Sequence, residues 1–293
     1  MPTWFVERPV GEMRPGDHAW LPFSTGEEQE HVIGAFVWDG LTTSSKVIYV
    51  GDARPDTVPG LRYRRRIDPV RYVEIGQLRV ISCEQARLNR DHFDPDRMLT
   101  VLEQEIAVSL DQGYRTVRIV ADMNCALRSR GGSELMRLYE DRLEVVVARS
   151  TSAMAICQID RADCGPAELI TLEDTHEVLA AANPEFDDGV LRITKTFAPA
   201  GLRLEGELDG ARHAVFAEVL ATATSMQETV HLDFARVRFI DLGALNLLAT
   251  QAMRMPSGRS VVLDDLPPEV VGVIEMVGWH RLPGVSLGRR KQP

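Results

Sequence analysis

The chain has 293 residues, of which 44% are hydrophobic, and this length and composition are typical of two globular domains rather than a disordered chain. Its formal charge is −10, with a net −11 over residues 1–190 and +1 over residues 191–293, which argues against a nucleic-acid partner because nucleic acid needs a basic face. No apolar run approaches the roughly 20 residues that cross a bilayer, and no signal-peptide pattern opens the chain, so we expect a cytoplasmic protein without a membrane partner.

Strand-like and helix-like segments alternate through the first half of the chain. Short apolar or β-branched runs predict strands at residues 18–23, 46–50, 78–82, 116–120 and 153–157. Apolar residues at a helical period predict helices at 27–41, 134–148, 166–171 and 174–182, and a further helix that starts at Asp94 and ends before Gly113. This alternation predicts an α/β fold, with a parallel sheet covered by helices on both faces.

A different arrangement follows a break in the pattern. Residues 183–189 are turn-forming and acidic, which predicts a linker. Beyond them, strands are expected at 191–197, 202–208, 229–234, 239–240, 260–263 and 284–287, and helices at 213–224, 242–255 and 268–277. We therefore expect one domain at 1–183 and a small α/β domain at 190–289.

Three segments of the second half carry a family resemblance. They read Gly-Glu-Leu-Asp at 206–209, His-Leu-Asp-Phe at 231–234 and Arg-Phe-Ile-Asp-Leu-Gly-Ala-Leu at 238–245. Together they resemble the STAS family, which includes bacterial anti-sigma factor antagonists. The resemblance implies a protein-interaction domain whose partner is an anti-sigma factor or another regulatory protein. It places the partner-binding surface at Asp241, Leu242, Gly243, Ala244 and Leu245.

The STAS-like turn lacks the residue that the family's antagonists phosphorylate. In those antagonists, Asp is followed by two hydroxyl residues, and a phosphate there adds about two negative charges at a helix N-terminus. Here the two positions hold Leu242 and Gly243. Either the domain binds its partner constitutively under control of the first domain, or it serves as a scaffold or dimerisation module. Asp241 is also a good N-cap for the helix that follows.

The first half resembles the MEDS sensory domain through a series of short segments in order. They read Gly-Asp-His-Ala-Trp at 16–20, Val-Ile-Tyr-Val at 47–50, Phe-Asp-Pro-Asp at 93–96, Tyr-Glu at 139–140, Cys-Gln-Ile-Asp at 157–160 and Thr-His at 175–176. MEDS domains occur in DcmR-type and actinobacterial anti-sigma regulators. The resemblance implies a decayed relative of RecA/KaiC-like ATPases that senses small organic ligands such as hydrocarbon derivatives.

A ligand pocket is expected where the parallel strands end. Ligands of open parallel sheets sit outside the carboxyl ends of the strands, where polar residues follow three of the predicted strands here. With the residues that the resemblance adds, the expected ligand-binding set is His18, Trp20, Asp52, Asp122, Tyr139, Glu140, Gln158, Asp160 and His176. Each has a structural alternative: the rings can be core residues, the histidines structural, and Asp52 and Asp122 helix caps.

Enzymatic signatures are absent from the sequence. The loop after the first strand has one glycine, no lysine and the acidic pair Glu27 and Glu28, so it lacks what a phosphate-binding loop needs. The sequence predicts no GxSxG turn between a strand and a helix, because its GVSLG at 284–288 falls on a predicted strand near the end of the chain, and it contains no HExxH. We expect no enzyme, no cofactor and no metal, since a site built from His18, Cys157 and His176 would rest on long-range spacing alone. The cysteines are expected to be thiols. The sequence leaves a homodimer open.

Overall fold

The computed structural model describes residues 6–62, 68–89, 92–127 and 132–290, and the chain forms two compact units, Met1–Asn183 and Pro184–Pro293. Each unit has its own hydrophobic core. Within these described stretches, no helix is both long and apolar enough to cross a membrane.

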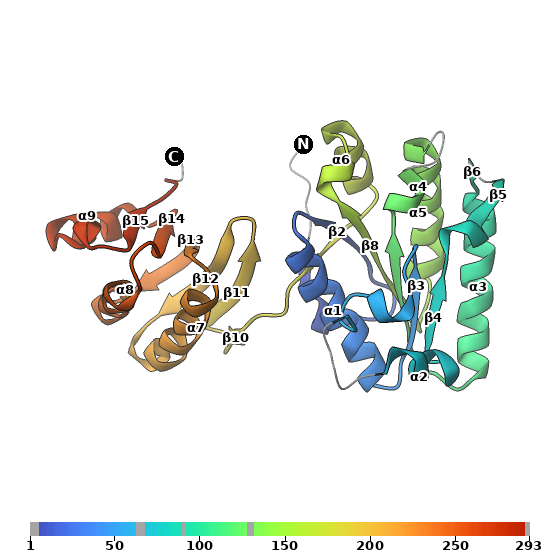
Figure 1. The fold of residues 1–293 in the computed structure, drawn as a ribbon, viewed down its shortest axis with the longest axis horizontal. Coiled ribbons are helices and arrows are strands. Elements are labelled where there is room, and N and C mark those ends of the chain that lie inside the picture. The colour runs from blue at the N-terminus through green and yellow to red at the C-terminus, as the bar shows by residue number, and fades with distance from the viewer. Residues whose placement is uncertain (1–5, 63–67, 90–91, 128–131, 291–293) are drawn as a thin grey trace. The chain divides into compact units, whose positions relative to one another are not determined.

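A seven-stranded parallel sheet forms the centre of the first unit (Figure 1). Parallel pairing joins every pair of neighbouring strands, which confirms the predicted α/β class. In spatial order the strands are β1 (Val6–Pro9), β9 (Val178–Ala181), β2 (His18–Phe23), β8 (Ala153–Asp160), β7 (Val117–Asp122), β3 (Lys46–Val50) and β4 (Leu78–Ile81). A separate two-stranded pair joins β5 (Arg87–Asn89) to β6 (His92–Phe93).

Helices cover both faces of this sheet. One face packs against α1 (Gly26–Thr42), where Val32, Ile33, Phe36 and Val37 supply the buried stripe. The opposite face packs against α3 (Pro95–Asp111) and α5 (Gly132–Ala148), which also contact each other. The side chain of Thr25 accepts a hydrogen bond from the Glu28 amide and caps α1, and Asp94 caps α3 in the same way. The shorter helices are α2 (Pro69–Glu74), α4 (Asn124–Leu127) and α6 (Pro166–Glu173).

One predicted helix is a strand instead. Residues 174–182 were expected to be helical, but β9 occupies Val178–Ala181 and pairs with both β1 and β2. A run of four small apolar residues is compatible with either structure, and here its backbone completes the hydrogen bonds of the sheet. β1 itself was not predicted.

The second unit is a six-stranded mixed sheet with helices on one face. In order along the sheet, the strands are β10 (Phe186–Asp187), β11 (Leu191–Phe197), β12 (Ala200–Leu208), β13 (Thr229–Ile240), β14 (Ser260–Asp264) and β15 (Val285–Leu287). β10 to β12 pair antiparallel, and β12 to β15 pair parallel. The covering helices are α7 (His213–Met226), α8 (Leu242–Arg254) and α9 (Pro268–Met276).

Buried and half-buried residues alternate along β13, so the core of this unit lies on one face of the sheet. Val230, Leu232 and Phe234 are buried, whereas the residues between them are half-buried on the other face. They pack with Phe216 of α7 and with apolar residues of α8 and α9. Burying such a side chain contributes about 1.5–3 kcal/mol, so this row fixes the register of the sheet.

The cysteines depart in part from the expectation of free thiols. Cys157 is a buried thiol and Cys164 a half-buried one. Cys83, which directly follows β4 and Ser82, is disulfide-bonded. Free thiols were expected because disulfides are rare in a reducing compartment. Whether two cysteines can bond also depends on the distance that the fold sets between them, which the sequence does not give.

Candidate functional site

Four side chains that are far apart in the sequence converge in the core of the first unit. They are His18, Glu140, Cys157 and His176, and one nitrogen, oxygen or sulfur atom of each lies within 4.8 Å of those of the others. His18 Nε2 is 3.0 Å from Glu140 Oε2 and 3.2 Å from Cys157 Sγ. His176 Nε2 is 3.3 Å from the same Glu140 oxygen. Each residue is at most 5% exposed, so the cluster is closed to solvent.

The sheet register and one helix bring these residues together. His18 is the first residue of β2, which runs beside β8 so that Trp20 pairs with Cys157. Glu140 lies on α5, which packs against both strands. His176 follows α6, and its ring stacks on Trp20 with the ring centroids 5.1 Å apart. The cluster therefore depends on tertiary contacts between segments that span nearly the whole unit.

Burial and charge act against each other within this cluster. Burial raises the pKa of Glu140, but the imidazoles of His176 and His18 outweigh burial and bring that pKa to about 2. Burial lowers the pKa of His18, but the carboxylates of Glu140 and Glu144 outweigh it and raise that pKa to about 9. Burial, with Glu140 nearby, raises the pKa of the Cys157 thiol well above its ordinary value. These shifts favour a carboxylate at Glu140, a charged imidazole at His18 and a neutral thiol at Cys157.

A separate polar network occupies the opposite face of the sheet. Gln158 donates to the Tyr49 hydroxyl at 2.9 Å, and Gln29 of α1 donates to Gln158 at 3.1 Å. Successive residues of a strand point to opposite faces, so Gln158 must point away from the cluster that contains Cys157. Burial raises the pKa of Tyr49, which keeps this network neutral.

The predicted carboxylates at the strand ends accept hydrogen bonds from backbone amides. Asp122 Oδ1 accepts from the Asn124 amide at 3.0 Å, and Asp160 Oδ1 from the Ala162 amide at 2.9 Å. The Asp122 contact matches the capping alternative stated for it, because it satisfies an amide at the start of the next helix. Asp52 does not cap the helix that follows it: its Oδ1 accepts from the Cys83 amide at 3.1 Å, which links the ends of β3 and β4.

The expected nine-residue pocket is therefore divided. His18, Trp20, Tyr139, Glu140 and His176 are packed in the core on the α5 face, whereas Gln158 and Asp122 belong to the α1 face. Residues near the strand ends were expected to form one set, but neighbouring residues of a strand point to different faces of the sheet. Cys157, which was not among the expected ligand-binding residues, completes the buried cluster.

In the second unit, the turn before α8 contains hydrogen-bonded polar groups and two exposed apolar residues, Leu242 and Phe239, which form its apolar tip. Asp241 Oδ1 accepts from the Ala244 amide at 2.8 Å and lies 2.8 Å from His213 Nε2. Burial raises the pKa of Asp241, but the amides of Ala244 and Gly243 and the imidazole of His213 together lower it below its ordinary value. Leu242 is 64% exposed and the preceding Phe239 is 50% exposed.

The turn leaves no free space for a side chain at position 243. A Cβ atom on Gly243 would lie 2.3 Å from His213 Cε1, so any larger residue there must displace that ring. Two other predicted partner residues, Ala244 and Leu245, are buried in the core of this unit. This corrects the expected binding surface, because the helical period turns both toward the sheet. Asp241, Leu242 and Gly243 remain at the accessible end of the turn.

Comparison with protein families identifies both units. A model described as "MEthanogen/methylotroph, DcmR Sensory domain" (MEDS) matches residues 17–177, more than half of the chain. The chain belongs to the MEDS family. A second model, described as "Mlab, STAS domain", matches residues 191–285, so a STAS domain follows the MEDS domain. Both resemblances drawn from the sequence are confirmed.

One solved structure is similar to the chain at low sequence identity. The crystal structure of a KaiC-like protein from the hyperthermophilic archaeon Pyrococcus horikoshii OT3 is similar with a TM-score of 0.44 and 11% identity, over 62% of this chain and 79% of that chain. No curated protein matches the chain significantly.

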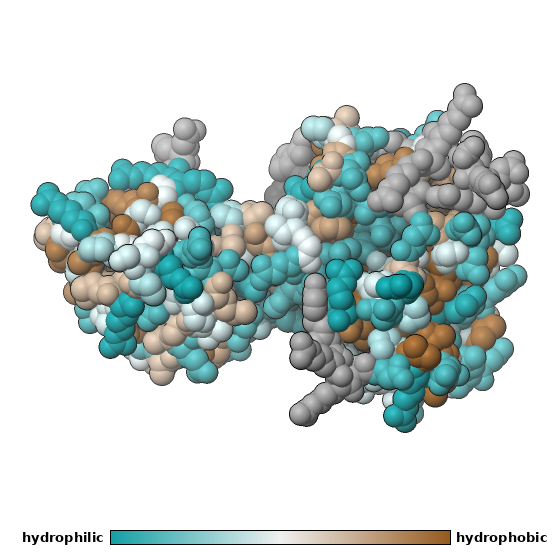
Figure 2. Space-filling model, in the orientation of Figure 1, coloured by the Kyte–Doolittle hydropathy of each residue, from teal (hydrophilic) through white to brown (hydrophobic). Residues whose placement is uncertain are grey.

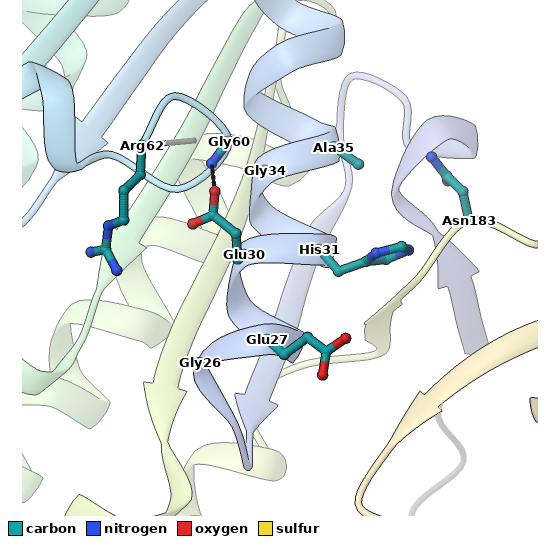
Figure 3. Close-up of a pocket in the computed structure, with 9 residues that line it drawn as sticks. All are labelled: Gly26, Glu27, Glu30, His31, Gly34, Ala35, Gly60, Arg62 and Asn183. Carbon is teal, nitrogen blue, oxygen red and sulfur yellow. Dashed lines mark hydrogen bonds between the residues drawn. The ribbon is translucent and has the colours of Figure 1, made fainter. Parts of the chain in front are cut away.

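The MEDS domain also carries a surface groove along α1 that the sequence did not indicate. Its volume is about 710 Å³, and Figure 3 shows Glu30 and Arg62 on one side of α1 and His31 and Asn183 on the other. Glu30 accepts a hydrogen bond from the Gly60 amide at 2.7 Å, and Gly60 has a φ of +85°, which favours glycine. The remaining lining residues are Gly26, Glu27, Gly34 and Ala35.

Proposed function

We propose that the protein is a cytoplasmic signalling regulator in which a small organic ligand of the MEDS domain controls binding of the STAS domain to an anti-sigma factor or a related regulatory protein. The proposal involves no reaction catalysed by this chain and no nucleic-acid or membrane partner. The family assignments support a regulatory role, because one domain is of a sensory family and the other of an interaction family.

The observation that carries the proposal is the exposed apolar tip at Leu242 and Phe239. Leu242 and Phe239 are large apolar side chains that remain half or more exposed, and exposed apolar groups that lie together are typical of docking surfaces. Leu242 stands where the family's antagonists carry a hydroxyl, so phosphorylation of that position cannot release a partner from this chain. Control must then come from elsewhere, and the MEDS domain is the candidate.

Two features of the MEDS domain bear on where a ligand binds. The five predicted residues of the α5 face are closed to solvent and offer no entry to an organic molecule. The groove along α1 falls within the range of about 300–1,000 Å³ that small-molecule sites occupy. One of its lining residues, Asn183, is the last residue of the first unit, and its Oδ1 accepts from the Gly11 amide at 2.7 Å. A ligand there would touch the residue from which the linker departs.

The test measures binding of the full-length chain to purified kinase-type anti-sigma factors by calorimetry. We expect the wild type to bind one of them, and Leu242→Asp to weaken binding at least 10-fold because it places a charge in an apolar contact. Met253→Asp, an equally exposed position at the far end of α8, is the matched control and should leave binding unchanged.

A second arm repeats the measurement with small halogenated and oxygenated hydrocarbons present. A ligand that controls docking must change the dissociation constant, since it acts only through different affinities for two states of the protein. The absence of any partner at every ligand condition would reject the proposal.

The alternative function is a non-sensing scaffold or oligomerisation module. The packing of the predicted ligand residues into the core supports it, as does an apolar patch over α2 and the end of α3 (Figure 2). The exposed apolar residues of these segments are Val70, Val73, Ile75, Val108 and Leu110. Light scattering coupled to size-exclusion chromatography measures the oligomeric state and distinguishes the regulator from the oligomerisation module. A stable homodimer that Val73→Asp converts to a monomer would favour the oligomerisation module.

A further inference from the structure

The buried cluster of the MEDS domain has the composition of a metal site. Imidazole nitrogen, thiolate sulfur and carboxylate oxygen are the three donor types that zinc takes in proteins. With bond lengths of about 2.0–2.3 Å, tetrahedral ligand atoms lie about 3.3–3.8 Å apart. The contacts of 3.0, 3.2 and 3.3 Å, with all four atoms within 4.8 Å of one another, are close to that arrangement.

The two histidines are oriented with their Nε2 atoms toward the centre of the cluster. His18 Nδ1 lies 2.8 Å from Glu144 Oε2, and His176 Nδ1 lies 2.9 Å from the backbone carbonyl of Leu172. Both partners are acceptors, so each Nδ1 carries the proton and donates it. Metal-binding histidines are held in this way, by a carboxylate or a carbonyl on the nitrogen that does not bind the metal.

Several atoms at the centre have no other partner. Both Glu140 carboxylate oxygens and His176 Nε2 are fully buried, and within the described part of the chain they form no hydrogen bond apart from the ion-pair contacts of the cluster itself. Such groups cost about 1–3 kcal/mol each when buried unsatisfied, and more when charged. A bound cation would satisfy all three at once.

Charge balance points to a divalent ion. Binding of a metal ion would release the protons on His18 Nε2 and Cys157 Sγ. The two neutral imidazoles, one carboxylate and one thiolate that result carry a total of two negative charges, which one divalent cation neutralises. Since all four residues are buried, the cluster offers no entry to an organic molecule. Since all four positions would be filled by protein, the site would be structural rather than catalytic.

We propose that His18, Glu140, Cys157 and His176 bind one zinc-class divalent transition-metal ion in a closed four-coordinate site. The objection from long-range spacing is removed by the fold, because the sheet register and α5 supply the proximity that the sequence lacks. The ion would tie β2, α5, β8 and the segment after α6 into one unit. This inference does not depend on the proposed partner or organic ligand.

The test begins with the wild-type full-length chain, stripped of metal by a chelator and then titrated with Co²⁺ as a spectroscopic probe for zinc. We expect saturation at one equivalent, a cobalt–thiolate charge-transfer band, and a change in fluorescence because Trp20 stacks on His176. Added Zn²⁺ should displace the cobalt and raise the melting temperature. A chelated wild-type chain that remains folded and gains no thiolate band would overturn the proposal.

Variants assign the ligands. Cys157→Ser should lose the thiolate band, whereas Cys164→Ser, which removes a second free thiol among the described residues, should keep it. Glu144→Gln leaves the four proposed ligands intact but weakens the acceptor on His18 Nδ1, so we expect a 10–100-fold loss of affinity. A band that survives in Cys157→Ser, or that disappears in Cys164→Ser, would place the cobalt elsewhere and reject this site.

Discussion

The two domains differ in how they depart from the usual distribution, in which titratable groups are exposed and apolar groups are buried. The MEDS domain places titratable groups at its centre, with Glu140 and His176 almost fully buried. The STAS domain places apolar groups at its surface, with Leu242 and Phe239 half or more exposed. Buried charged groups are rare in proteins unless they are paired, whereas single exposed apolar residues are common. The buried cluster is therefore the stronger signal of the two, and it motivates the proposed ion inside the first domain as the turn motivates the proposed partner of the second.

The two domains also differ in how far apart in the sequence the residues of each site lie. The MEDS cluster uses residues from positions 18 to 176, so damage to it should affect the whole domain. The STAS turn is held by a cap and one imidazole over a few residues. Changes there should alter binding and local order while the rest of the domain stays folded.

The largest expected effect is that of Glu140→Ala in the chelated protein. Removing one partner from a buried ionic group leaves the imidazoles uncompensated and should lower the free energy of unfolding of the MEDS domain by about 3–5 kcal/mol. Urea titration followed by fluorescence measures it. The neighbouring Asp141→Ala, at a half-exposed position, should cost less than about 0.5 kcal/mol. Equal losses in the two variants would contradict a long-range role for the cluster.

A smaller effect is expected for Asp241→Ala. This change removes the cap of α8 and the partner of His213, and we expect a loss of about 1 kcal/mol in the STAS domain alone. Hydrogen exchange resolved by peptide should show faster exchange in the first turn of α8 and no change in the MEDS domain. Faster exchange across β12 to β15 as well would mean that the turn is not a local feature.

Gly243→Ser should have a still smaller effect on stability. The new Cβ must displace the His213 ring and so weaken, without removing, its contact with Asp241, at a cost of about 0.5 kcal/mol, the lower end of the range for one hydrogen bond. The Asp241→Ala variant has already lost this contact, so the serine should cost much less in that background. A double-mutant cycle measures the coupling. Additive losses would show that position 243 acts independently of His213.

The weakest expected effect is a dependence of STAS stability on acid. The pKa of Asp241 is lower in the folded chain than its ordinary value, so its contribution is complete above the unfolded pKa of about 3.9 and is lost as pH falls through the folded pKa. Melting scans between neutral and acid pH should show a smaller loss in Asp241→Asn than in wild type. Identical slopes would indicate that Asp241 is not involved.

Local features of this fold were predictable from the sequence because they depend on neighbouring residues. The caps at Asp94 and Asp241 and the buried strands at 46–50 and 153–157 follow from side-chain hydrogen bonding and β-branched runs. The α/β class and both family assignments followed as well.

The composition of the site was only partly predictable. His18, Glu140 and His176 were singled out, but their convergence on Cys157 depends on strand order and on which face each side chain takes. Nothing local distinguishes Cys157 from an inert core thiol. The His213 contact and the groove along α1 also depend on tertiary packing, and no motif marks them.

Strand β8 imposes a strict requirement on its own length. Cys157 and Gln158 are neighbours in the chain, yet they serve networks on opposite faces of the sheet. Inserting or deleting one residue between Ala153 and Cys157 would exchange the two faces, so that the thiol met α1 and the amide met the histidines. Point substitutions in this strand can therefore have effects of different sizes. A one-residue change in its length should instead abolish the buried cluster and the Gln158 network together.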